Sequence, residues 1–264
     1  MPSEPIYVIT GASKGIGLET LRYLSEVPGY IISVSRTIPE ELSKILNANT
    51  SKIAHFCGNV QDPEVSKMVI RTIEEKGGKL NALILNAGIA LPIAPIKDID
   101  VEVWKAVFDV NFFSMVDLAQ RAIPYLKKGK GRVIMLSSGA AVDPKNGWST
   151  YCCSKACVNM FAKVLSMEES DIQTIALRPG VVDTDMQELI RKQMKNGFTK
   201  EECEKFKNYE KNKLLKDPKE PASVIFNLSI PENEFPKELN GEFVSIDDEK
   251  LAKFKTFTTA AEKK

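Results

Sequence analysis

The stretch TGASKGIG, residues 10–17, places Gly11, Gly15 and Gly17 directly after the apolar run IYVIT and before a segment with helical periodicity. Glycine permits a tight turn and the close approach of the backbone to a ligand. The N-terminus of the following helix offers unpaired N–H groups and a favourable dipole to an anion. The stretch therefore predicts a strand, a turn and a helix that bind the pyrophosphate of a dinucleotide, although such turns also occur without a ligand.

Short apolar runs recur along the chain, with longer amphipathic segments between them. Residues 62–76, for example, carry Val65, Val69 and Ile73 at helical spacing after an Asp-Pro start. The alternation predicts an α/β fold with a doubly wound parallel sheet, a Rossmann fold, in a single domain over residues 1–264. The predicted strands are nearly continuous apolar runs, as burial on both faces requires: IYVIT, YIISVS, ALILNAG, RVIMLSS, IQTIALRPG and GEFVSI.

Composition and charge narrow the choice of partners. Lys and Arg number 36 against 35 Asp and Glu, so no overall field attracts nucleic acid or an anionic membrane. No run of about 18 apolar residues suggests a membrane-spanning helix, and MPSEPIYVIT lacks the basic start of a secretory signal. The five cysteines are odd in number and lack the spacing of a disulfide framework. We therefore expect a cytoplasmic protein with a small-molecule partner and with no nucleic acid or membrane partner.

The segment STYCCSKAC, residues 149–157, raises the possibility of thiol or metal chemistry. The paired spacing of zinc sites is absent, however, and the only histidine, His55, belongs to a distant part of the chain. We therefore expect no metal site and interpret Cys152, Cys153 and Cys157 as small apolar packing residues.

The same segment holds Tyr151 and Lys155, four residues apart in a predicted helix, so their side chains share one face. An ammonium group near a phenol is expected to lower the phenol's pKa from its ordinary value of about 10. Tyr151 would then give and take a proton near neutral pH. A Tyr-x-x-x-Lys pair also arises by chance on helix surfaces, so its context has to decide.

That context resembles the short-chain dehydrogenase/reductase family over nearly the whole chain. The resemblance rests on the GxxxGxG spacing, on NAG at residues 86–88, on Tyr151 with Lys155, and on RPGVVDTDMQ at residues 178–187. NGWSTYCCSKA and PGVVDTDMQ are most similar to the sepiapterin-reductase-like branch, especially the fungal benzil reductases. The resemblance implies four catalytic residues, Ser138 (13 residues before Tyr151), Tyr151, Lys155 and, in DVNFFS, Asn111.

The resemblance also implies a nicotinamide cofactor. NAD-preferring members carry an acid after the second strand, whereas this chain has Ser35 and Arg36, and a guanidinium suits the 2′-phosphate of NADP(H). Lys14 adds a second cation nearby, and Asn59 stands where the family has an acid for the adenine amine. NADP(H) is therefore the expected cofactor. Its implied contacts are Gly11, Ser13, Lys14, Gly15, Ile16, Gly17, Arg36, Asn59, Val60, Asn86, Ala87, Gly88, Tyr151, Lys155, Pro179, Gly180, Val182 and Thr184.

The activity implied by the resemblance is NADPH-dependent reduction of a ketone or diketone such as benzil, with the proton supplied by Tyr151. Two alternatives stay open. One is a sepiapterin or pterin reductase, although Ser245 stands near the place of that branch's substrate-binding acid; the other is a non-catalytic NADP(H) sensor. Residues 185–217 are strongly charged and helical in pattern, which indicates either solvated helices or a substrate lid. The resemblance further implies a homodimer or homotetramer.

Overall fold

Seven parallel strands form one sheet in the computed structural model, which describes residues 4–256. Their order is β3-β2-β1-β4-β5-β6-β7, so the chain reverses direction across the sheet between β1 and β4. This is the predicted doubly wound Rossmann fold in a single domain. The strands are β1 (Ile6–Thr10), β2 (Tyr30–Ser35), β3 (Ile53–Cys57), β4 (Ala82–Leu85), β5 (Arg132–Leu136), β6 (Gln173–Arg178) and β7 (Phe243–Ser245).

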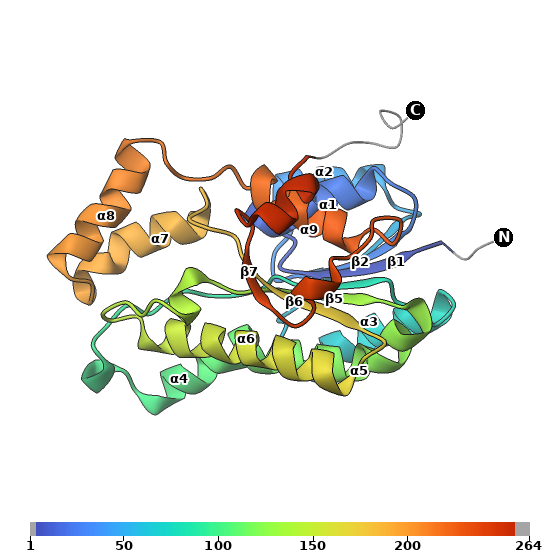
Figure 1. The fold of residues 1–264 in the computed structure, drawn as a ribbon, viewed down its shortest axis with the longest axis horizontal. Coiled ribbons are helices and arrows are strands. Elements are labelled where there is room, and N and C mark those ends of the chain that lie inside the picture. Colours follow the sequence, from blue (N-terminus) through green and yellow to red (C-terminus); the bar gives the residue numbers. More distant parts are fainter. Residues whose placement is uncertain (1–3, 257–264) are drawn as a thin grey trace.

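Helices cover both faces of the sheet (Figure 1). One face packs against α1 (Gly15–Ser25), α2 (Glu40–Ala48) and α9 (Lys219–Ser229). The other packs against α3 (Pro63–Glu75), α5 (Ser114–Gly129) and α6 (Ser149–Glu168). The remaining helical elements are α4 (Val101–Phe108), α7 (Asp185–Gln193), α8 (Lys200–Lys211), the π-helical turn η2 (Asp109–Phe113) and the 3-10 turns η1 (Ile96–Asp98), η3 (Gly139–Ala141), η4 (Met194–Asn196), η5 (Lys237–Leu239) and η6 (Glu249–Phe254).

The helix predicted at residues 62–76 is α3, and the side chain of Asp62 caps it by accepting a hydrogen bond from the Glu64 N–H at 2.9 Å. Strand β3, by contrast, is missing from the six predicted apolar runs. Its sequence, IAHFC, has only Ile53 fully buried, because β3 lies at the edge of the sheet and pairs only with β2. A half-exposed edge strand needs no continuous apolar run, so the pattern that detects central strands fails here.

Residues 185–217 form α7, η4 and α8, which stand apart from the sheet at the left of Figure 1. Most of their charged side chains face outward, but the inner face is apolar and packs on residues of η3 and α6 and of the chain between β4 and α4. The buried cluster that results has its own core, separate from the two faces of the sheet. It contains Ala90, Ile93, Ala140, Trp148, Tyr151, Cys152, Ile190, Met194, Phe198, Cys203 and Phe206.

The amino edge of the sheet is closed by a buried arginine, Arg132, the first residue of β5. Its Nη1 donates to the carbonyl oxygens of Leu228 and Ile230, both at 2.8 Å, and so satisfies acceptors at the end of α9. Its Nη2 donates to the Asn233 carbonyl at 2.6 Å and its Nε to Gln173 Oε1 at 3.1 Å. Every nitrogen of the guanidinium is thus used in holding the fold together.

Candidate active site

A cavity of about 220 Å³ opens at the carboxyl edge of the sheet, beside the point where the strand order reverses. Parallel sheets of this topology bind their ligands at this position. Most of the predicted site residues line it: Gly11, Ser13, Lys14, Gly15, Ile16, Arg36, Val60, Asn86, Ala87, Gly88, Tyr151, Lys155, Pro179 and Thr184.

The glycine-rich loop has the shape that a pyrophosphate requires. Gly11 adopts a φ of +72°, and a Cβ there would lie 2.8 Å from Asn86 Nδ2 and 2.9 Å from Ala87 Cα. Asn86 Nδ2 in turn donates to the carbonyls of Thr10 and Gly11 at 3.0 and 3.1 Å, which fixes the turn. Helix α1 begins at Gly15 with no side-chain cap, so its first N–H groups are free to bind an anion. The loop therefore fits a dinucleotide.

Two cations stand at the mouth of this cavity. Arg36, directly after β2, is exposed and forms no ion pair within residues 4–256. Lys14 Nζ lies 2.6 Å from Asp185 Oδ2, so an ion pair joins the glycine loop to the start of α7 across the cavity wall. Of the two, Arg36 is the cation free to bind an added phosphate.

Several predicted cofactor contacts do not line the cavity. Asn59 is exposed between the lining residues Gly58 and Val60. Gly17 packs against the loop itself, since a Cβ there would lie 2.2 Å from the Gly11 carbonyl oxygen. The contacts of these two residues with a cofactor stay predictions.

Gly180 and Val182 shape the turn after β6. Gly180 has a φ of +84° and packs against the side chain of Lys216. Val182 is buried and forms an isolated parallel bridge with Lys216, where the Lys216 N–H donates to Val181 O and the Asp183 N–H donates to Lys216 O, both at 2.9 Å. The two ends of the α7–α8 segment therefore meet at this turn.

Tyr151 and Lys155 line the cavity, and Ser138, which does not line it, lies beside Tyr151. Ser138 follows β5, and its side chain shares a hydrogen bond with the Tyr151 phenol. Lys155, one turn further along α6, places its Nζ 5.8 Å from the centre of the Tyr151 ring and donates to the Leu136 carbonyl at 2.7 Å. Both Tyr151 and Lys155 are buried. The structure brings Tyr151 and Lys155 to the cavity and Ser138 next to Tyr151, and the catalytic roles of all three stay predictions.

Burial sets the protonation of this group. It raises the pKa of Tyr151 to about 12, with the Ser138 hydrogen bond acting in the opposite direction. It also lowers the pKa of Lys155 to about 8. The prediction that Lys155 lowers the pKa of Tyr151 is therefore wrong for this structure, because burial raises this pKa and only the Ser138 hydrogen bond opposes the rise. At neutral pH Tyr151 is a protonated phenol, the form that donates a proton.

Asn111 lies in the π-helical turn η2 between α4 and α5 and is fully buried. Its Nδ2 donates to Ile89 O at 2.9 Å and to Ser154 Oγ at 3.0 Å, while its Oδ1 accepts from the Ile89 N–H at 2.8 Å. The π-turn interrupts the helix at this residue. Asn111 therefore holds the Ile89 backbone beside the cavity, and its catalytic role stays a prediction.

Nine residues that line the cavity are absent from the predicted site. Most are sequence neighbours of predicted ones, so only the structure could tell which of two adjacent side chains faces inward. Asp185 and Met186, however, come from α7 and bring the charged segment into the wall of the site. The nine are Ser35, Gly58, Gln61, Ile89, Val110, Leu136, Ser137, Asp185 and Met186.

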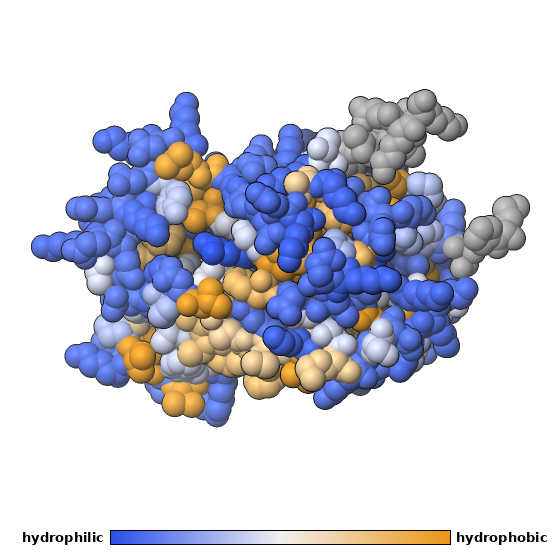
Figure 2. Space-filling view, in the orientation of Figure 1, coloured by the Kyte–Doolittle hydropathy of each residue, from blue (hydrophilic) through white to orange (hydrophobic). Residues whose placement is uncertain are grey.

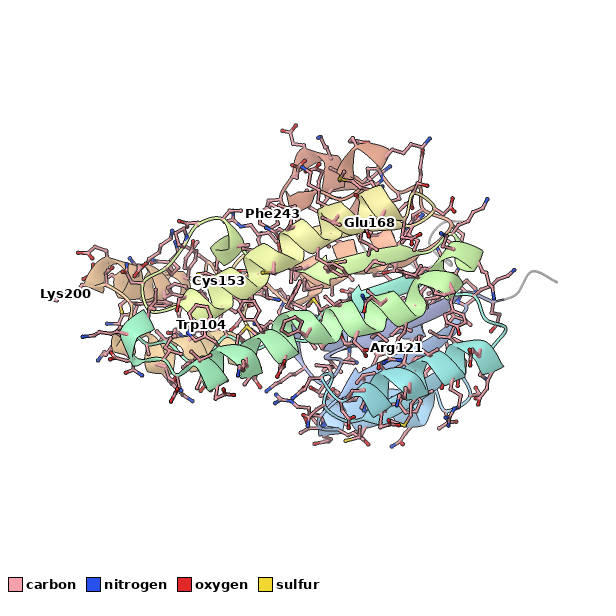
Figure 3. All side chains as sticks on the ribbon, turned by 90° about the horizontal axis from the view of Figure 1, so that it is seen from below. Trp104, Arg121, Cys153, Glu168, Lys200 and Phe243 are labelled. Atoms are coloured by element: carbon pink, nitrogen blue, oxygen red, sulfur yellow. The ribbon has the colours of Figure 1, made fainter. Side chains whose placement is uncertain are left out.

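The cysteines take no visible part in the site. All five are free thiols, and between residues 4 and 256 no three His, Cys, Asp or Glu residues lie together where a metal ion could bind. Cys152 packs in the buried cluster under α7 and α8, as expected. Cys153 is exposed, so its interpretation as a packing residue is wrong: it faces outward from α6, near Trp104 of the neighbouring α4 (Figure 3). No helix in the described part of the chain is both long and apolar enough to cross a membrane.

A doubly wound sheet with a dinucleotide cradle and a Tyr-Lys pair at its carboxyl edge defines the class of nicotinamide-dependent oxidoreductases. The sequence model of the short chain dehydrogenases matches residues 5–195. The chain belongs to this family and is an oxidoreductase.

Individual relatives agree with this assignment. The chain is 42% identical over 243 residues to an uncharacterised oxidoreductase of Schizosaccharomyces pombe, covering 92% of this chain and 96% of the relative. It is 37% identical over 257 residues to a benzil reductase ((S)-benzoin forming) of Saccharomyces cerevisiae, covering 93% and 97%. Among solved structures, a short-chain dehydrogenase/reductase of S. cerevisiae superposes with a TM-score of 0.90 at 32% identity, covering 96% of this chain and all of the other.

Proposed function

We propose that the protein is an NADPH-dependent carbonyl reductase that acts on ketones and diketones, with benzil as the model substrate. The observation that carries the proposal is the buried, protonated phenol of Tyr151, which shares a hydrogen bond with Ser138 and lies beside Lys155 in a cavity that fits a dinucleotide. The similarity to a relative named benzil reductase supports the choice of substrate.

The cofactor is assigned as NADP(H) rather than NAD(H). Arg36 lines the cavity directly after β2, and no acidic residue there competes for its guanidinium. The glycine loop and the uncapped start of α1 would hold the pyrophosphate, and the Val182 backbone and the Thr184 hydroxyl would hold the carboxamide. When bound, the nicotinamide supplies the hydride.

Each residue of the site has its own role in supplying the proton to the substrate. Tyr151 donates its phenolic proton to the carbonyl oxygen, while Ser138 donates a hydrogen bond to the same oxygen, where negative charge develops. Lys155 uses its spare donors to bind the ribose and to replace the proton on Tyr151. Asn111 positions the Ile89 backbone next to this group and connects it toward solvent.

The wall of the cavity favours an apolar carbonyl substrate over a pterin. Ile89, Val110 and Met186 line it together with the Tyr151 ring. The acids near the end of the last strand are already engaged, since Asp247 pairs with Lys216 Nζ at 2.9 Å and Asp248 caps η6. By the family resemblance, Ser245 stands near the place where the sepiapterin-reductase branch holds its substrate with an acid, and this favours a diketone.

The charged segment 185–217 is proposed as the substrate lid of the single NADP(H)-binding domain. Its apolar inner face covers Tyr151, and its residues Asp185 and Met186 line the cavity. A lid predicts slower proteolysis of this segment when NADPH and a ketone are added together. Cleavage at an unchanged rate would contradict it.

A homodimer or homotetramer is the proposed assembly, formed through the layer of α4, η2 and α6. Phe113, Met160, Val164 and Met167 are exposed there, and Figure 2 shows hydrophobic surface along the lower edge, where α4 and α6 lie in Figure 1. Sedimentation should give more than one chain per particle, and Met160→Glu should reduce the assembly to monomers. The free thiols favour a cytoplasmic location.

The test of the proposed function is the loss of NADPH absorbance with benzil, other diketones, aryl ketones and sepiapterin, with NADH in parallel. Turnover of a diketone with NADPH is the expected result. Turnover of sepiapterin alone would favour the pterin reductase. NADPH binding without reduction of any carbonyl would leave the non-catalytic sensor as the function to pursue.

A further inference from the structure

A tryptophan, Trp148, lies against the ring of Tyr151. It immediately precedes α6, three residues before Tyr151, and the two rings are stacked with their centres 4.5 Å apart and an angle of 23° between their planes. Both residues are buried: only 6% of the Trp148 surface and 7% of the Tyr151 surface are exposed. Trp148 does not line the cavity, so its contact is with the proton donor and not with the space for a substrate.

The indole itself is fixed from two directions. Its Nε1–H donates to the carbonyl of Ala90, in the segment that follows β4. The carbonyl of Gly147, the residue before it, accepts a backbone hydrogen bond from the Ala94 N–H at 2.9 Å. The segment that follows β4 is thus bonded both to the indole and to the backbone next to it. A ring held in this way provides a rigid surface for its neighbour.

Trp148 also contacts two aromatic side chains of the proposed lid. Phe198, just after η4, packs edge-on at 5.4 Å between ring centres, and Phe206 of α8 packs edge-on at 6.3 Å. Aromatic pairs at these distances are attractive and directional. A displacement of α8 would therefore disturb the packing of Trp148 and, through the stacked ring, that of Tyr151.

The Tyr151 phenol has two kinds of support. Its hydroxyl shares a hydrogen bond with Ser138, and its ring face rests on Trp148. Ser138 alone fixes the hydroxyl but not the tilt of the ring. Since displacement of a reacting group by about 1 Å can lower a rate by about 100-fold, the second support has a direct consequence for proton transfer.

We propose that Trp148 is a positioning residue for carbonyl reduction: it fixes the tilt of the Tyr151 ring and couples it to the seating of residues 185–217. The inference rests on the proposed function, in which Tyr151 is the proton donor. No bond is formed or broken at Trp148.

The first test compares Trp148→Leu, which removes the stack, with Trp148→Phe, which keeps an aromatic ring. Trp148→Leu should lower kcat with NADPH and a diketone by about 10- to 100-fold, with the KM for NADPH unchanged, and Trp148→Phe should recover most of kcat. Tyr30→Phe, at the amino end of β2 and outside both the cavity and the α4–α6 layer, is the control and should behave as the wild type. An unchanged kcat in Trp148→Leu, measured on folded protein, would overturn the proposal.

A second readout does not depend on turnover. The absorbance of the Tyr151 phenolate can be titrated as the difference between each protein and the same protein carrying Tyr151→Phe. Removal of Trp148 lets water reach the ring, so the midpoint of this titration should fall, whereas a tryptophan that acts only as a core residue elsewhere would leave it in place.

The coupling to the lid is tested with Phe206→Leu. This substitution should lower kcat in the wild type and have no further effect in Trp148→Leu, and equal effects in both backgrounds would remove the coupling from the proposal. Absence of any carbonyl reduction by the wild type would be a failure of the proposed function. Normal reduction by both the wild type and Trp148→Leu would be a failure of the positioning role alone.

Discussion

Arg132 and Lys155 are the two buried cationic side chains of the described residues, and they lie at opposite edges of the same sheet. Arg132, at the amino edge, donates from all three of its nitrogens to four acceptors. Lys155, at the carboxyl edge, has one acceptor within residues 4–256, the Leu136 carbonyl. One cation is fully satisfied by the protein, and the other keeps donors that face a cavity.

The difference shows how to separate structural from functional charges. A buried charge is costly unless it is paired and hydrogen-bonded, so a fully bonded one is retained for the fold. A buried cation with spare donors at a cavity is available to a ligand. The following substitutions test this division, starting from the largest expected effect.

Tyr151→Phe should abolish function at the carboxyl edge without affecting the fold. Loss of the proton donor should lower kcat by about 10³-fold or more, because general acid catalysis contributes about 10²- to 10⁴-fold. The Kd for NADPH, measured by fluorescence, should change by less than about twofold. Tyr125→Phe, whose hydroxyl bonds Glu74 on the surface, is the control. Substantial turnover by Tyr151→Phe would remove Tyr151 from the mechanism.

Arg132→Met, at the amino edge, should lower stability without affecting turnover. The free energy of unfolding in urea should fall by about 3 kcal/mol or more, because the buried or half-buried carbonyls of Leu228, Ile230 and Asn233 lose their donor. The kcat of the folded fraction should be unchanged. Arg121→Met removes an exposed pair with Asp117 and should cost less than about 1 kcal/mol. Equal losses for the two variants would contradict a structural role for Arg132.

Arg36→Leu tests the exposed cation at the mouth of the cavity. Loss of the guanidinium should weaken NADPH by about tenfold, or about 1.4 kcal/mol, and leave the Kd for NADH nearly unchanged. The two Kd values can be measured by titration calorimetry at fixed ionic strength. Arg71→Leu, on the exposed face of α3, is the control and should alter neither. A parallel loss of both cofactors would exclude a contact with the 2′-phosphate.

Lys155→Met should stabilise the protein by about 3 kcal/mol at neutral pH while it destroys turnover, because burial of the ammonium group is unfavourable. The folded pKa of Lys155 is lowered to about 8 from an ordinary 10.5. The penalty is therefore complete below pH 8 and is relieved as the pH rises to about 10.5, so the wild type should approach the variant over this window. Urea unfolding without added cofactor measures both. Lys163→Met, on the surface of α6, should show neither effect.

Local patterns predicted the parts of the molecule that depend on local order. The glycine turn, α3 and the central strands follow from composition and periodicity, and the spacing of Ser138, Tyr151 and Lys155 follows from the family resemblance. The stack of Trp148 on Tyr151 depends on how the chain after β4 and α8 pack around α6, which no short pattern encodes. The direction of the Tyr151 pKa was missed for the same reason, because burial is a property of the assembled fold.

The bridge between Val182 and Lys216 has a consequence for how specificity could change. The chain between Val182 and Lys216 starts and ends at one hydrogen-bonded point. Its length can therefore change with little effect on the strands of the sheet. The segment between these two residues could be replaced by one of different length or composition, because both ends would still be joined by the same hydrogen bonds. To accommodate a new substrate, such a substitute would have to keep Thr184, Asp185 and Met186 in the cavity wall and an apolar face against Trp148 and Tyr151.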